Sequence, residues 1–238
     1  MDSKRTQNEK IHDRIPIKRI KDKNSEKLGD GMKKKIYRDY IKRGIDVIVS
    51  IAGLVLTFPI LLIIAIAIKL DSKGDIFFKQ KRLGRKGHEF IIYKFRSMCM
   101  NVEKTGTGQY SFRGDPRVTK VGKIIRATSI DELPQFLNII KGDMSLVGFR
   151  PPLTYHPWSI EEYTEEQKKM FNVRPGVTGW AQVHGRKEVQ WKDRIEMGVW
   201  YSENVSFWLD IKIIFMTIIK VLKNENNENT VLTVDNNK

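Results

Sequence analysis

Apolar residues are distributed very unevenly along this chain, and one run dominates the pattern. Residues 47–68, VIVSIAGLVLTFPILLIIAIAI, carry no charge over about 22 positions, which is long enough to cross the hydrocarbon core of a bilayer as a helix. The run is too long, and begins too late in the chain, to be a cleaved signal peptide. The pattern therefore predicts a membrane protein whose membrane helix lies within residues 37–70.

The flanks of this run are basic on both sides. Residues 1–36 are polar, rich in Lys and Arg and without a sustained apolar period, which predicts a flexible basic tail. The cations that closely follow the run are Lys69, Lys73, Lys79, Lys81, Arg82, Arg85 and Lys86. Basic flanks favour the cytoplasmic side and anionic lipid, so both ends of the helix are expected on the same side of the membrane.

A proline in the middle of the run provides a bend point. Pro59 removes one backbone hydrogen bond and crowds the preceding turn, and Thr57 could bond to the freed carbonyl. We expect a re-entrant helix broken at Pro59, and an ordinary kinked single-pass anchor is the alternative. Near the start, Lys42 and Arg43 precede Asp46 by a spacing that lets the charges pair on one helix face.

The rest of the chain predicts short strands among helices. Residues 75–82 and 88–98 are β-branched and aromatic runs joined by LGRKG, which predicts a hairpin, and a long polar loop follows from residue 101. Apolar positions between 120 and 140 recur at helical spacing with a break at Thr128 and Ser129, which predicts two helices. The other predicted elements are a strand in SLVGFRPPL, a helix over 161–171, a short strand within 173–186, and an apolar helix over 207–223 on the core or in the membrane interface.

These elements predict an α/β fold, mostly helical with a small β-hairpin or sheet. A monotopic anchor, residues 37–70, would carry a soluble domain, residues 71–223, and the polar residues 224–238 would form a disordered tail. The single cysteine, Cys99, excludes an internal disulfide and a cysteine metal site.

Net charge narrows the class of partner. The chain has 43 Lys and Arg against 28 Asp and Glu, a formal charge of +15, which points to nucleic acid, an acidic membrane surface or phosphorylated small molecules. The sequence contains no helix-turn-helix, zinc or RNP-like pattern, and the charge is concentrated beside the membrane run. We therefore expect no nucleic acid partner and favour membrane lipids and phosphates.

Two adjacent acids are the main candidates for chemistry. In TSIDELPQF, Ser129 and Glu132 fit a capping box for a helix with Pro134 in its first turn, which is the structural interpretation. A capping box does not require Asp131, and a helix N-terminus can also receive a phosphate. An aspartate can attack a phosphoryl group, a neighbouring glutamate can hold Mg²⁺, and Arg126 in the preceding helix could grip phosphate oxygens.

Several motifs in one order give the chain a specific resemblance. They are KRGID, the proline-broken apolar run, FFKQKRLGRKGHEFIIYKFRSM, DPRVTKVGKIIRATSIDELPQFLNIIKGDMSLVGFRPP, RPGVTGWAQVHGR and YSENVSFWLDIKII. From about residue 37 to residue 222 the chain resembles the bacterial polyprenyl-phosphate sugar-1-phosphate transferases, the monotopic phosphoglycosyl transferases. In this chain Phe58 precedes the helix proline where the family commonly has Ser, and Phe149 replaces the first proline of the family's Pro-Arg-Pro.

The resemblance implies a re-entrant anchor in the inner membrane, a catalytic domain on the cytoplasmic face, and Mg²⁺ as cofactor. It implies that Asp131 takes a sugar-phosphate from a nucleoside-diphosphate sugar, usually a UDP-sugar, and that a polyprenyl phosphate then accepts it. Glu132 matches the metal ligand. The residues that match the family's substrate-binding motifs are Arg126, Arg150, Lys94, Arg96, Asp115 and Arg117. The alternative is a non-catalytic membrane adaptor of polysaccharide assembly with the same fold.

Overall fold

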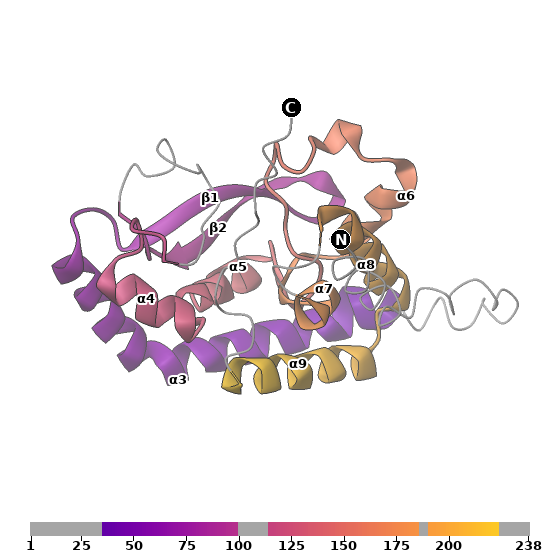
Figure 1. Cartoon of the computed structure of the whole chain (residues 1–238). Helices are drawn as coiled ribbons and strands as arrows, with labels where there is room; N and C mark the ends of the chain where they lie inside the picture. Colours follow the sequence, from indigo (N-terminus) through magenta and orange to yellow (C-terminus); the bar gives the residue numbers. More distant parts are fainter. Residues whose placement is uncertain (1–34, 100–113, 186–189, 224–238) are drawn as a thin grey trace, which may run out of the picture. The chain divides into compact units, whose positions relative to one another are not determined.

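One long helix forms the base of the fold in Figure 1. The structure is a computed structural model that describes residues 35–99, 114–185 and 190–223. Residues 1–34 of the predicted N-terminal tail, the predicted C-terminal tail and most of the loop after residue 101 lie outside the described residues. Helix α3, Lys42–Asp71, follows a π-helical turn, Tyr37–Ile41, and is long and apolar enough to cross a membrane. The predicted apolar helix is therefore present.

Helix α3 passes through its proline without ending. Pro59 lies inside the helix, so the backbone shows no break there, and the re-entrant geometry stays a prediction. The predicted partner of Thr57 is wrong, because its hydroxyl donates to the carbonyl of Gly53 at 2.6 Å. The carbonyl that Pro59 leaves without its helical donor belongs to Val55, four residues before the proline.

Helix α3 packs on the rest of the fold at both ends and in the middle. Near its start, Asp46 accepts a 2.6 Å hydrogen bond from Ser145. In the middle, Gly53 lies so close to the Phe136 ring that an added Cβ would come within 2.7 Å of it. Near its end, Ile68 forms an apolar cluster with buried side chains of β2 and α4. The helix thus lies along the domain for its whole length (Figure 1).

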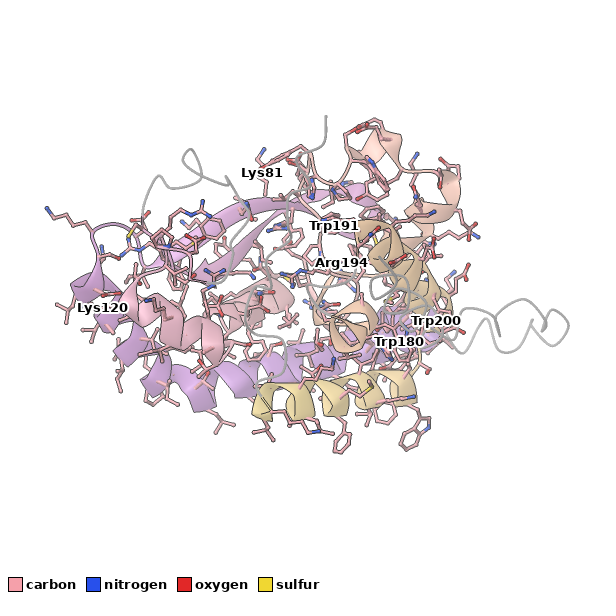
Figure 2. All side chains as sticks on the ribbon, in the orientation of Figure 1. Lys81, Lys120, Trp180, Trp191, Arg194 and Trp200 are labelled. Carbon is pink, nitrogen blue, oxygen red and sulfur yellow. The ribbon has the colours of Figure 1, made fainter. Side chains whose placement is uncertain are left out.

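The side of α3 that faces away from the domain is apolar and exposed. Helix α9, Phe207–Leu222, lies beside it and continues the same apolar face, and Figure 2 shows side chains of both helices projecting away from the domain. The most exposed apolar residues on the two helices are Ile48, Val55, Leu56, Phe58, Ile63, Leu70, Trp208, Phe215 and Leu222. Such a continuous apolar surface fits a lipid environment better than water.

The described residues also form two small two-stranded sheets. The predicted hairpin is confirmed as β1, Phe77–Leu83, and β2, Glu89–Phe95, with Phe78 opposite Lys94. The predicted strands after residues 144 and 172 are also confirmed, as β3, Ser145–Val147, and β4, Gly176–Thr178, which pair in parallel. Their backbones approach closely, since a Cβ added to Gly176 would lie 2.1 Å from the Gly148 nitrogen.

The helices follow the predictions only in part. The two helices expected between residues 120 and 140 are α4, Lys120–Ala127, and α5, Gln135–Lys141. The helix expected over 161–171 is divided into a 3₁₀ turn, Ile160–Glu162, the short α6, Glu165–Lys168, and a second 3₁₀ turn, Lys169–Asn172. Two helices were not predicted: α7, Trp180–His184, and α8, Trp191–Asn204. The described residues therefore form a mostly helical fold with two small sheets, in agreement with the predicted class.

Candidate active site

The turn between α4 and α5 presents the two adjacent acids. Thr128 ends α4, Ser129 has a left-handed backbone with φ 58°, and Ile130–Glu132 form a 3₁₀ turn before Pro134 leads into α5. The predicted capping box is wrong, because the Ser129 side chain makes no capping hydrogen bond and α5 begins only at Gln135. Ser129 takes the left-handed position that commonly terminates a helix, so it stops α4 instead of starting α5.

Glu132 is paired with a lysine from the hairpin. The Lys94 ammonium donates to Glu132 Oε1 at 2.6 Å, and both side chains are partly buried, with exposed fractions of 19% and 26%. Strand β2 therefore brings a cation to the acids from 38 residues away in the sequence. This charge-assisted bond orients the Glu132 carboxylate.

Asp131 is partly buried and has a perturbed acidity. Burial, together with the neighbouring Glu132 charge, raises the pKa of the Asp131 carboxyl to about 6, while the Lys94 and Arg126 charges act in the opposite direction. At neutral pH the group is mostly ionised but poorly solvated. A carboxylate in this condition is well suited to act as a nucleophile, because it loses less hydration when it attacks.

The acids also fit the magnesium ion that the resemblance implies. Mg²⁺ commonly takes one or two protein carboxylates and completes its shell with water and substrate phosphate oxygens. Asp131 and Glu132 supply adjacent carboxylates that repel each other, and a divalent cation would relieve this repulsion. Among the described residues no group of three or more His, Cys, Asp or Glu side chains is arranged as a metal site, so phosphate oxygens would have to supply further ligands.

The other predicted substrate residues differ in their contacts with the acids. Arg126, in the last turn of α4, acts electrostatically on Asp131. Arg150 follows β3 and makes no hydrogen bond or ion pair with either acid among the described residues. Asp115 is buried and receives hydrogen bonds from the Arg117 backbone and guanidinium at 2.8–3.2 Å.

Arg96 has a clear structural contact. Its guanidinium is buried and donates to the carbonyls of Ile68, Ser72 and Lys73 at 2.7–3.2 Å, at the C-terminal end of α3. A cation at a helix C-terminus satisfies carbonyls that have no helical donor. The substrate role predicted for Arg96 stays a prediction, whereas its role in fixing the end of α3 is visible.

The charged residues at the start of α3 form a second cluster that the sequence indicated only in part. Lys42 lies 4.0 Å from Asp46, as predicted, but Arg43 instead donates to the carbonyls of Ile139 and Ile140 at the end of α5. Lys42 also makes a 2.7 Å bond to Asp210 of α9.

Asp210 is the buried acid of this cluster, and the sequence analysis missed it. The hydroxyls of Tyr37 and Tyr201 donate to its two oxygens at 2.7 and 2.6 Å. A lone acid in the apolar sequence FWLDIKII was the available signal, because a buried carboxylate requires partners from elsewhere in the fold.

Comparison with known proteins identifies the family. Residues 37–224 match the family described as Bacterial sugar transferase. The chain is 43% identical over 198 residues to the UDP-N-acetylgalactosamine-undecaprenyl-phosphate N-acetylgalactosaminephosphotransferase of Aeromonas hydrophila, covering 82% of this chain and 46% of that protein. It is 41% identical over 191 residues to the UDP-glucose:undecaprenyl-phosphate glucose-1-phosphate transferase of Escherichia coli strain K12, covering 78% of this chain and 41% of that protein.

A shorter relative matches over nearly its whole length. The uncharacterized sugar transferase EpsL of Bacillus subtilis strain 168 is 42% identical over 190 residues, which cover 80% of this chain and 91% of that protein. The chain thus spans less than half of the two longer relatives but most of the shorter one. Because the family match extends from the π-helical turn before α3 to the end of α9, this chain belongs to the Bacterial sugar transferase family.

Proposed function

We propose that this chain transfers a sugar-1-phosphate from a UDP-sugar to undecaprenyl phosphate through a covalent intermediate on Asp131. The observation that carries the proposal is the environment of Asp131, an ionisable carboxylate kept poorly solvated beside Glu132, Lys94 and Arg126. The named relatives support the substrate class, since their names specify UDP-sugars and undecaprenyl phosphate. The reaction would initiate assembly of an exopolysaccharide, a capsule or another glycan.

The first step is a displacement at the phosphorus that carries the sugar. An oxygen of the Asp131 carboxylate forms a bond to this phosphorus, the bond to the bridging oxygen breaks, and UMP leaves with that oxygen. Lys94 and Arg126 offset the negative charge that gathers on the phosphoryl oxygens. Glu132, with Asp131, would hold Mg²⁺, which when bound supplies charge neutralisation for the diphosphate.

The second step regenerates the enzyme. A phosphate oxygen of undecaprenyl phosphate attacks the same phosphorus, the acyl-phosphate bond breaks, and the Asp131 carboxylate is restored. The product is undecaprenyl-diphospho-sugar. A direct reaction between two anionic phosphates is difficult. The carboxylate divides it into two successive displacements, each at the same positioned group. In this scheme Arg150, Asp115 and Arg117 bind or organise substrate, and their individual roles are part of the proposal.

A monotopic membrane placement fits this reaction. Both ends of α3 contact the same domain, through Asp46 at the start and Ile68 at the end, so a straight passage would carry the domain into the bilayer. We therefore propose that α3 enters and leaves the membrane on the cytoplasmic face of the inner membrane, with its apolar face towards lipid. This placement would bring a lipid-borne phosphate to the level of the domain.

The test is UMP release by the detergent-purified full chain. A panel of UDP-sugars is supplied with Mg²⁺ and undecaprenyl phosphate, and Asp131→Asn is assayed in parallel. Release from one donor that is lost in the variant and after chelation supports the proposal. Release that is unaffected by Asp131→Asn contradicts Asp131 as the nucleophile. Absence of release from every donor favours the non-catalytic adaptor over a transferase for the tested sugars.

A further inference from the structure

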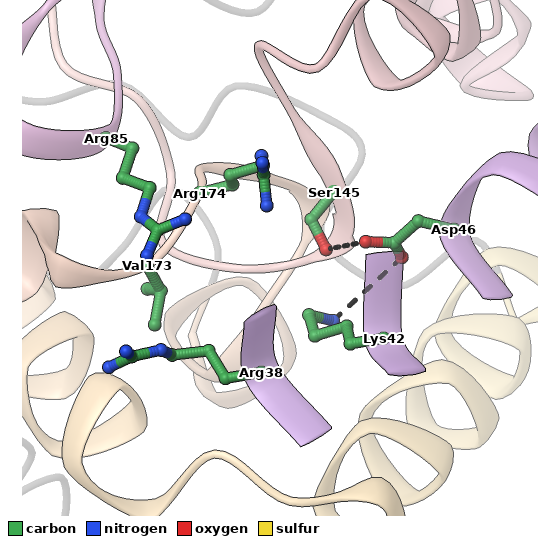
Figure 3. Close-up of a pocket in the computed structure, with 7 residues that line it drawn as sticks. All are labelled: Arg38, Lys42, Asp46, Arg85, Ser145, Val173 and Arg174. Atoms are coloured by element: carbon green, nitrogen blue, oxygen red, sulfur yellow. Dashed lines mark hydrogen bonds and ion pairs between the residues drawn. The ribbon is translucent and has the colours of Figure 1, made fainter. Parts of the chain in front are cut away.

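Three arginines from separate parts of the chain line one recess near the start of α3. Arg38 belongs to the π-helical turn before α3, Arg85 to the tip of the β1–β2 hairpin, and Arg174 to the segment before β4. In Figure 3, Arg85 and Arg174 line one side of the recess, and Ser145, Asp46 and Lys42 line the other. The fold therefore brings three guanidinium groups to one place.

The positive charge in this recess is only partly balanced. Arg38 and Arg85 share a single carboxylate, that of Asp39, with bonds of 2.8–3.0 Å. Arg174 donates through Nε to the neutral carbonyl of Gly142 at 2.9 Å, and among the described residues its terminal nitrogens have no hydrogen-bond partner. The Arg85 Nε is buried and also lacks a partner among the described residues. Several guanidinium donors therefore remain available for an anion.

The one acid among the residues that line the recess, Asp46, does not supply the missing acceptor. The Asp46 oxygens already accept from Ser145 Oγ at 2.6 Å and from the Leu146 nitrogen at 3.1 Å. Burial lowers the pKa of Arg174, and the Arg85 and Arg43 charges lower it further, while the Asp46 and Asp39 charges act in the opposite direction. Arginine is the side chain best suited to grip phosphate, because its fork of donors matches two phosphate oxygens.

The recess lies far from the two acids of the candidate active site. Arg85 follows the strand pair Leu83 and Glu89 at the hairpin tip, whereas Lys94 is near the other end of β2. Five residues of extended strand separate Glu89 from Lys94, about 17 Å at the usual rise per residue. A phosphate bound by Arg85 would therefore not occupy the position of the phosphate attacked by Asp131.

The residues around the recess are suited to a position at the membrane surface. Tyr40 and Ile41, two and three residues after Arg38, are 76% and 52% exposed, and the apolar face of α3 begins at this level. The recess also shares Lys42 and Asp46 with a neighbouring, mainly apolar recess between α3, β3 and α9. A lipid could thus place its phosphate among the arginines and its chains along the apolar face.

We propose that Arg38, Arg85 and Arg174 form a binding site for the phosphate group of a membrane lipid, separate from the Asp131 and Glu132 site. The site would fix the start of α3 at the headgroup level and set the height of the domain above the lipid. The inference rests on the proposed membrane location of α3 and is independent of the transfer reaction.

The test is a titration of the thermal midpoint of the detergent-purified full chain with phosphatidic acid. Diacylglycerol with the same acyl chains measures apolar association without the phosphate, and inorganic phosphate measures a soluble anion. Arg174→Gln removes a guanidinium from the recess, and Lys86→Gln removes a charge of the same sign from an exposed neighbour at the hairpin tip. We expect Arg174→Gln to weaken the phosphatidic acid response about tenfold and Lys86→Gln to leave it unchanged.

The possible results distinguish a lipid phosphate site from apolar association and from binding of a soluble anion. Stabilisation by phosphatidic acid that exceeds the diacylglycerol effect and depends on Arg174 supports the site. An equal response to both lipids, or an equal response to inorganic phosphate, overturns it. If Arg174→Gln does not fold, Arg85→Gln and the charge-conserving Arg174→Lys replace it, and a loss of response with Gln but not with Lys supports the site. UMP release, assayed separately, reports on the transferase proposal alone.

Discussion

Two clusters of a lysine with two acids in the described part of the chain, one at the start of α3 and one in the turn before α5, differ in their burial and bonding. At the start of α3, Lys42, Asp46 and Asp210 are only 3–6% exposed. Protein donors reach both oxygens of each of these carboxylates at 2.6–3.1 Å. In the turn before α5, Lys94 contacts Glu132, while burial leaves the Asp131 pKa raised to about 6.

The two clusters are therefore suited to different roles, one structural and one chemical. A buried carboxylate with all its oxygens bonded has no capacity left for a substrate, and removing it leaves other buried charges without partners. A partly open carboxylate keeps electron pairs available for attack on a substrate. We therefore propose that the Lys42 cluster joins α3, β3 and α9, and that the Lys94 cluster carries out the chemistry.

The largest expected effect is on the reaction. Asp131→Asn should reduce UMP release by about 10³-fold or more, because an amide cannot replace the carboxylate nucleophile. Circular dichroism and the thermal midpoint of the variant should remain those of a folded protein. A variant that retains release within about tenfold would show that the nucleophile is elsewhere.

The second effect is on the fold. Asp210→Asn should lower the free energy of unfolding by about 3 kcal/mol, since it leaves the Lys42 ammonium and the Tyr201 hydroxyl with a weaker partner in a buried place. The measurement is the thermal midpoint in detergent, with the exposed Glu161→Gln as a matched control. Equal midpoints for the two variants would contradict a structural role for this cluster.

The third effect links the lysine of the open cluster to the acidity of Asp131. Lys94→Met should lower the rate about 10- to 100-fold and move the acidic limb of the pH–rate profile to higher pH. The direction follows because the Lys94 charge lowers the Asp131 pKa, so its removal raises that pKa. A rate loss without any shift of the profile would indicate that Lys94 acts on substrate alone.

The smallest effect is a gain in stability. The folded-state pKa of Asp131 is above its ordinary value of 3.8, so the folded state prefers the protonated form, and ionisation costs stability as the pH rises from about 4 to about 6. Asp131→Asn should therefore raise the free energy of unfolding by about 1–2 kcal/mol above pH 6. Paired thermal midpoints at pH 4.5 and 7.5 should show a clearly larger gain at the higher pH. A gain of the same size at both would assign it to packing.

The sequence predicted the elements whose signals are local. The long apolar helix and the β-hairpin follow from uninterrupted composition and from strand residues around a glycine turn, and both are present. The capping box was wrong because two local rules competed at Ser129, and its left-handed backbone ends α4 instead of capping α5. Helix α8 was missed because polar residues separate its buried positions, such as Ile195 and Val199.

The sequence predicted the two acids of the candidate site but not the residues that contact them. Asp131 and Glu132 are adjacent in the sequence, so their pairing needs no fold. The contact between Lys94 and Glu132 depends on β2 lying beside the turn, and that of Lys42 with Asp210 joins residues 168 positions apart. Such contacts depend on tertiary packing, which local patterns in a single sequence do not reveal.

The most direct measurement is a search for the covalent intermediate. The full chain is mixed with its UDP-sugar and Mg²⁺ without undecaprenyl phosphate, quenched in acid, digested and analysed by mass spectrometry. The account predicts a sugar-phosphate adduct on the peptide that contains Asp131, which disappears when undecaprenyl phosphate is added before the quench. An adduct on another residue, or acceptor-dependent turnover with no adduct at any time, would contradict Asp131 as the nucleophile.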